Sequence, residues 1–163
     1  MGRRLNYVAE KVTFLTAIAL FALSCYILYN AREEFYSILM RFNFQFQTFF
    51  DFLNFYTKFG CMVFSIFGLA SSLHYLYGFV RKAENRVQVF FYYLCALTVY
   101  LICLGVMGIV EGYQCYETYK NTGGPSGKDD MFLGAVFIIF GQFAGYFALI
   151  SQVAVKSAQK CLP

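Results

Sequence analysis

The chain has 163 residues, a formal net charge of +4, and a composition that is 60% hydrophobic, 21% aromatic and 13% charged. Soluble domains carry about 25% charged residues, so a water-soluble fold of this size would leave too much apolar surface exposed. The basic residues are scattered and form no run of five or six, which argues against a nucleic-acid partner. An integral membrane protein is the class that remains.

Four apolar runs follow one another along the chain, each free of Asp, Glu, Lys and Arg: 12–29, 59–80, 87–110 and 131–155. A helix needs about 20 residues to cross roughly 30 Å of hydrocarbon, and such a span must satisfy its backbone hydrogen bonds internally. The sequence therefore predicts an all-α integral membrane protein, a four-transmembrane-helix bundle that forms a single domain over residues 1–163. The first run is the shortest, and we expect it to include flanking residues.

The segment 31–56, between the first two runs, carries large apolar residues at alternating spacings of four and three. This heptad spacing is typical of one face of a helix. The face consists of Phe35, Leu39, Phe42, Phe46, Phe49, Leu53 and Tyr56. The amphipathic segment either lies flat on the membrane or forms paired extensions of the first two spans, with a turn near Asn43. We expect its apolar face to pack on the protein's own helices, with a partner- or lipid-binding face as the alternative.

The later connections differ in length and composition. The short turn 81–86 predicts a tight antiparallel hairpin of the second and third spans. In the loop 111–130, Tyr113, Tyr116 and Tyr119 recur at three-residue spacing, which indicates that the third helix continues beyond the membrane. Asp129 and Asp130 precede the fourth run, where a helix N-terminus favours negative charge.

The flanking cations predict the orientation of the spans. One side of the membrane receives Arg3, Arg4, Lys11, Arg81, Lys82, Arg86, Lys156 and Lys160, and the other receives Arg32, Arg41, Lys58, Lys120 and Lys128. The positive-inside rule then places both termini in the cytoplasm or, in a mitochondrion, in the matrix. The first eight residues either contact anionic phospholipids, cardiolipin among the candidates, or only set the topology.

Small residues share one face of the fourth run, around an amide near its middle. The predicted helix-packing residues are Gly134, Gly141, Gln142, Gly145 and Ala148. Gly141 and Gly145 form a GxxxG motif that permits close backbone approach, and an amide in a span can bond across helices. We favour a contact within the chain over a homodimer. The candidates for the opposing surface are Gly105 and Gly108 in the third run, and Gly68, Ser71 and Ser72 in the second.

No pattern in the sequence predicts catalysis or metal binding. The chain has one histidine, His74, so it cannot supply two histidines to a haem, and its six cysteines form no CxxC motif. We expect His74 to bond to a neighbouring helix or reach the interface. Cys25 and Cys61 are near the outer ends of adjacent spans, where a disulfide is conceivable, but buried free thiols are the preferred interpretation.

The leading functional hypothesis is a non-catalytic accessory subunit of a large membrane complex, with other membrane subunits and phospholipids as partners. The first guess for its location is a respiratory complex or the ATP synthase of the mitochondrial inner membrane, because these recruit many small multi-span subunits. We expect no cofactor beyond a structural phospholipid. One alternative is a self-assembling tetraspan channel or scaffold of the plasma or vesicle membrane, and a less favoured one is a membrane enzyme that uses His74 or Cys115 on a lipophilic substrate.

Overall fold

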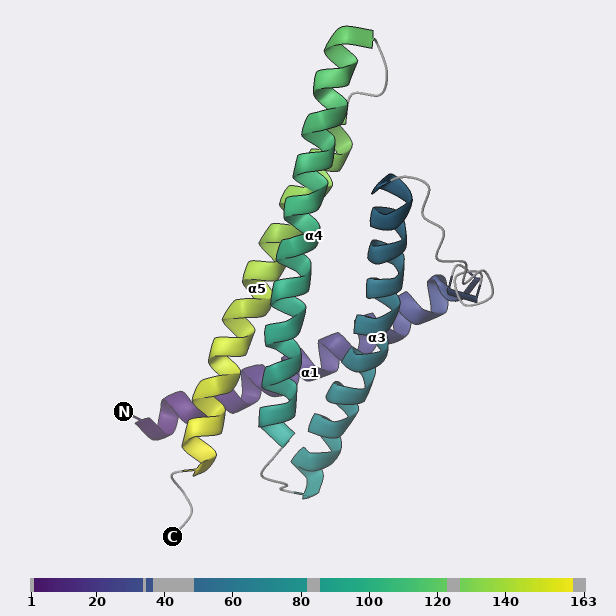
Figure 1. Ribbon diagram of the computed structural model, residues 1–163. Coiled ribbons are helices and arrows are strands. Elements are labelled where there is room, and N and C mark those ends of the chain that lie inside the picture. Colours follow the sequence, from purple (N-terminus) through teal and green to yellow (C-terminus); the bar gives the residue numbers. More distant parts are fainter. Residues whose placement is uncertain (1, 34, 37–48, 82–85, 123–126, 160–163) are drawn as a thin grey trace. The chain divides into compact units, whose positions relative to one another are not determined.

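The computed structural model describes residues 2–33, 35–36, 49–81, 86–122 and 127–159. The elements of this part of the chain are helices: α1 (Gly2–Asn30), α3 (Phe49–Arg81), α4 (Arg86–Thr122) and α5 (Lys128–Gln159) (Figure 1). Each contains a stretch long and apolar enough to span a membrane: Tyr7–Asn30, Thr57–Arg81, Arg86–Lys120 and Lys128–Val153. The predicted all-α class with four membrane-spanning helices is confirmed.

The helices are longer than the apolar runs that predicted them. α3 has 33 residues and α4 has 37, so α4 is roughly 55 Å long against a hydrocarbon core of about 30 Å. At the end of α1, helical hydrogen bonds continue from Ala31 N to Ile27 O and from Phe35 N to Ala31 O, both 2.9 Å. α4 ends where the sequence reaches Gly123-Gly124-Pro125, residues that do not continue a helix.

The chain divides into two compact units. The N-terminal unit comprises Met1–Tyr93 and Ser151–Pro163, and the hairpin unit comprises Leu94–Ile150. Each unit is described separately below. The predicted assembly of all four spans into one domain concerns the placement of these units relative to each other, and it stays a prediction.

In the N-terminal unit α1 packs on α3 with the two helices antiparallel. Near the start of α1, the rings of Phe14 and Phe79 lie 4.7 Å apart between centroids. Near its end, Ser24 faces Gly68, where an added Cβ would lie 2.6 Å from the serine Oγ. The first turns of α4 and the last turns of α5 also belong to this unit. The Tyr93 hydroxyl of α4 donates to the Phe64 carbonyl of α3 at 3.1 Å.

In the hairpin unit α4 and α5 are antiparallel and approach closely through glycines. Gly105 and Gly112 of α4 lie against the backbone of Gly134 and Gly127, respectively. Gly127 has a φ of 65°, a conformation that L side chains rarely adopt, and its carbonyl accepts from Met131 N at 3.1 Å. Asp129 and Asp130 occupy the first turn of α5, as the sequence predicted.

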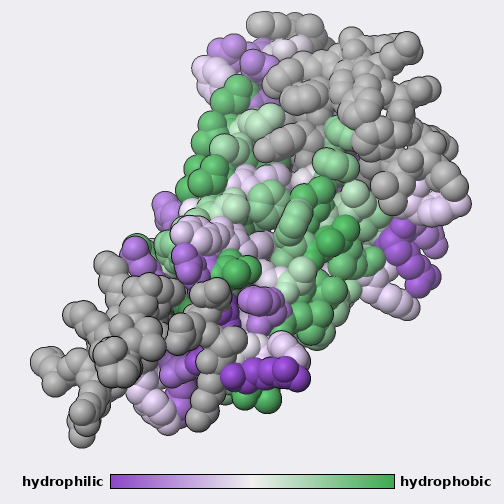
Figure 2. All heavy atoms as spheres, turned by 60° about the horizontal axis from the view of Figure 1, so that its bottom comes forward, coloured by the Kyte–Doolittle hydropathy of each residue, from purple (hydrophilic) through white to green (hydrophobic). Residues whose placement is uncertain are grey.

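Large apolar side chains remain exposed along all four helices. Examples are Leu15 (64%), Phe67 (62%), Val99 (63%) and Phe132 (73%). Figure 2 shows broad hydrophobic patches lying open on one face. Water would oppose such a surface, whereas lipid acyl chains solvate it, so the surface suits an integral membrane protein.

Candidate functional site

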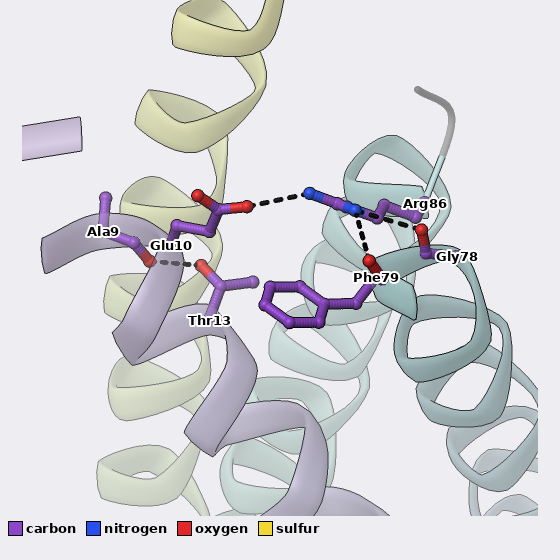
Figure 3. A network of polar contacts seen from close by, with 6 residues as sticks. All are labelled: Ala9, Glu10, Thr13, Gly78, Phe79 and Arg86. Carbon is purple, nitrogen blue, oxygen red and sulfur yellow. Dashed lines mark hydrogen bonds and ion pairs between the residues drawn. The ribbon is translucent and has the colours of Figure 1, made fainter. Parts of the chain in front are cut away.

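The Arg86 guanidinium makes polar contacts with two other helices of the N-terminal unit (Figure 3). Its Nη2 donates to Glu10 Oε1 of α1 at 2.8 Å, and its Nη1 donates to the Gly78 and Phe79 carbonyls at 3.0 and 3.2 Å. These carbonyls belong to the last turn of α3, which has no intrahelical donors left for them. The guanidinium also lies over the Phe79 ring, 5.0 Å from its centroid. One side chain thus caps α3, begins α4 and pairs with α1.

This geometry gives Arg86 a structural role in addition to the lipid contact predicted for it. Its side chain is 15% exposed and that of Glu10 is 44% exposed, so the ion pair is only partly open to solvent. The Arg86 guanidinium donates to three acceptors within the protein, so the residue connects three helices. Its predicted contact with lipid phosphate stays a prediction. Sequence reasoning did not single out Glu10. The available signal was that Glu10 and Arg86 flank spans on the same predicted side of the membrane.

Buried hydroxyl groups line the interior of the same unit. They belong to Thr13, Thr16, Ser24, Ser65, Ser71, Ser72 and Ser151. Thr13 Oγ1 donates to the Ala9 carbonyl at 2.8 Å and lies 3.4 Å from Ser151 Oγ, which joins α1 to the last turns of α5. Hydroxyls are the polar groups a membrane helix accommodates best, because they can bond to the carbonyl one turn earlier.

The predicted helix-packing residues mostly lie at the α4–α5 contact. A Cβ added at Gly134 would lie 2.6 Å from Gly105 O. A Cβ added at Gly141 would lie 2.9 Å from the Ile102 side chain. At Gly145 the nearest atom, in the Thr98 side chain, would be 3.4 Å away. Ala148 is 4% exposed. These residues face the interior of the chain. Gly108 does so too, because a Cβ added there would lie 3.3 Å from the Gly134 Cα.

Gln142 is placed differently from the prediction. Its side chain is exposed, and it makes no hydrogen bond with the residues that the structure describes. The reason is helical geometry, since Gln142 follows Gly141 and therefore projects about 100° around the helix from the glycine face. The amide does not join α5 to α4.

The remaining basic residues are only partly described. Lys11 Nζ lies 4.4 Å from the Tyr7 ring centroid, and the Arg81 guanidinium lies 4.8 Å from that of Tyr77. Lys11 and Arg81 are exposed, next to tyrosines of the kind that favours membrane interfaces. Lys82 and Lys160, and the side chains of Arg3, Arg4 and Lys156, lie outside the described residues. Lipid contact at Lys11 and Arg81 stays a prediction.

The described ends of the amphipathic segment continue α1 on one side and begin α3 on the other. Phe35, 8% exposed, follows α1, whereas Phe49 already begins α3. The side chains of Phe49, Leu53 and Tyr56, together with Leu39, Phe42 and Phe46, lie outside the described residues. Of the predicted apolar face only Phe35 has a described environment, and it is buried.

The residues considered for chemistry are dispersed. The His74 side chain is exposed. Cys25 and Cys61 are free thiols, but Cys25 is exposed and Cys61 is half-buried, so the expectation of buried thiols was wrong because these positions do not face the helix contacts. Among the described residues no three His, Cys, Asp or Glu side chains come close enough to hold a metal ion. Comparison with known proteins found no matching family model, no matching curated protein and no matching solved structure. The functional argument therefore depends on the geometry of this chain alone.

Proposed function

We propose that this protein is a non-catalytic structural subunit of a larger membrane complex, to which it contributes helix packing and lipid contacts. The observation that carries the proposal is the length of α4. Its apolar run ends at Val110, but the helix continues to Thr122 with Tyr113 and Tyr119 exposed. A spanning helix that only anchors a protein in lipid does not require such an aromatic extension.

The positions of Tyr113 and Tyr119 along α4 distinguish a tyrosine in the lipid headgroup region from one beyond it. Tyr113 is about 5 Å of helix rise beyond Val110, within the headgroup region where tyrosine is common. Tyr119, 44% exposed, is about 13 Å beyond it, and the headgroup layer adds only about 5–8 Å to each side of the hydrocarbon. Tyr119 therefore projects past the lipid. Exposed tyrosines in water are typical of protein interfaces, because their rings bury much area at low entropic cost.

The self-assembly alternative loses its best candidate surface. It required the small residues of α5 to meet a second copy of the chain, but Gly134 and Gly141 already pack on α4. The enzyme alternative is not strengthened, since the exposed His74 side chain has no hydrogen bond to a described residue that could act with it in catalysis. We keep the mitochondrial inner membrane as the first proposed location, with a respiratory complex or the ATP synthase as the assembly, and the plasma or vesicle membrane as the alternative.

A blue native gel of gently solubilised membranes tests the proposal. We expect the protein to migrate with a much larger complex whose other subunits mass spectrometry can name. Tyr119→Ser should release the protein from that complex, whereas Tyr119→Phe, which keeps the ring, should leave most of it bound. Migration of the unchanged protein as a monomer or small homo-oligomer would contradict a subunit role.

A further inference from the structure

Two hydroxyl groups inside the N-terminal unit differ from their neighbours. Ser72 and Tyr75 are both 0% exposed, and neither Ser72 Oγ nor the Tyr75 hydroxyl has a hydrogen-bond partner among the described residues. Other hydroxyls in this unit bond to their own helix: Thr13 to Ala9 O and Thr16 to Val12 O, both at 2.8 Å. Tyr75 cannot follow them, because the ring carries its hydroxyl far from its own backbone.

The two groups share one side of α3 and lie deep in the span. Residues three apart are neighbours on a helix surface, which places Ser72 and Tyr75 on the same side of α3. The Tyr75 ring lies 6.5 Å from that of Phe79 and 5.2 Å from that of Phe90, between centroids. Ser72 lies nine residues before Arg81, the end of α3, which corresponds to about 13 Å of helix rise. This depth is inside the hydrocarbon zone, where no bulk water reaches a polar group.

We propose that the N-terminal unit binds water inside the membrane, at the hydroxyls of Ser72 and Tyr75. The partner must be neutral, because the neighbouring charges, Glu10 and Arg86, already pair with each other at 2.8 Å. It must also be small, because Tyr75 is fully enclosed and packs on Phe90 at 5.2 Å. Water meets both conditions and can donate and accept in the same place.

Substitution tests whether the two hydroxyls share this water. In lipid nanodiscs, Tyr75→Phe and Ser72→Ala should each lower Tm by about 2–4 °C, since each removes a net stabilising bond. The double variant should lose less than the sum, because the second substitution removes a group whose water has already gone. Tyr77→Phe is the matched control, since Tyr77 is 60% exposed on the same helix. An unchanged or raised Tm in Tyr75→Phe overturns the proposal, because removal of a dry, unpartnered hydroxyl relieves a desolvation cost.

Radiolytic hydroxyl-radical labelling of the unchanged protein gives an independent readout, because a bound water forms radicals in place. We expect Tyr75 to be oxidised several-fold faster than Tyr93, whose hydroxyl bonds to Phe64 O. Ser72→Ala should slow the oxidation of Tyr75 and leave that of Tyr93 unchanged. Equal or slower oxidation of Tyr75 than of Tyr93 overturns the proposal, whatever the stability of the variants.

Discussion

At the scale of single residues, Arg86 shows how one charge can connect three helices. An arginine guanidinium can donate hydrogen bonds to a carboxylate and two carbonyls at once, because its N–H groups lie in a fixed plane. A lysine ammonium is a point charge on a flexible side chain. The contacts to Glu10, Gly78 and Phe79 use this planar geometry. The residue matters for its position at the start of α4 as much as for its charge.

Removal of Arg86 should therefore destabilise the N-terminal unit. We expect Arg86→Gln to lower the free energy of unfolding by about 1–3 kcal/mol, because it unpairs Glu10 and removes charged hydrogen bonds to the α3 carbonyls. The free energy of unfolding of Arg86→Lys should lie between those of Arg86→Gln and the unchanged protein. Glu10→Gln should cost about 1 kcal/mol or less, since the Glu10 side chain is 44% exposed. Unfolding in mixed micelles measures all three variants, and equal stability of Arg86→Gln and the unchanged protein would contradict this role.

At the scale of elements, the contact between α4 and α5 depends on where a methyl group has space. An added Cβ at Gly134 would lie 2.6 Å from Gly105 O and 2.8 Å from Ile109 N, both backbone atoms that cannot move without the helix. At Gly145 it would meet only the Thr98 side chain, at ordinary contact distance. The two glycines look alike in the sequence, but only Gly145 has space for an added methyl group.

Two alanine substitutions should therefore differ in their effect on stability. Gly134→Ala should destabilise the hairpin unit by about 1–3 kcal/mol, the range for overpacking a close contact. Gly145→Ala should be neutral or stabilise the protein by up to about 1 kcal/mol, because alanine is the better helix former. Unfolding of both variants in one detergent gives the comparison. Similar losses at both positions would show that α4 and α5 meet differently from the structure.

At the scale of the whole molecule, the number of spans determines the topology. Four crossings would return the chain to the side on which it began, and the cation bias predicts that this side is the cytoplasm or the matrix. Protease digestion of sealed vesicles should therefore cut N- and C-terminal tags together, in the same vesicle orientation. A tag inserted at 123–126 should show the opposite accessibility. Tags at the two termini that become accessible in opposite orientations would exclude four spans.

The sequence by itself determined the class of the protein, the number of spans and their approximate positions. A hydrocarbon layer of fixed thickness requires an apolar helix of a minimum length. Each of the four runs without charged residues has about this length, so the spans can be located from the sequence. The continuation of α4 beyond its run was also predicted, because Tyr113, Tyr116 and Tyr119 keep a helical spacing up to the Gly123-Gly124-Pro125 breaker. These features depend on local composition and length.

Only the tertiary structure decided which residues meet. The pairing of Glu10 with Arg86 joins positions far apart in the chain, and no spacing rule relates them. Gln142 was expected beside Gly141 in the helix contact, but it projects outward, because α4 covers a narrow face of α5 set by the glycines. The enclosed hydroxyls of Ser72 and Tyr75 also emerged only from packing. A sequence records which groups are polar, but their partners depend on which helix faces come together, and that is a property of the folded chain.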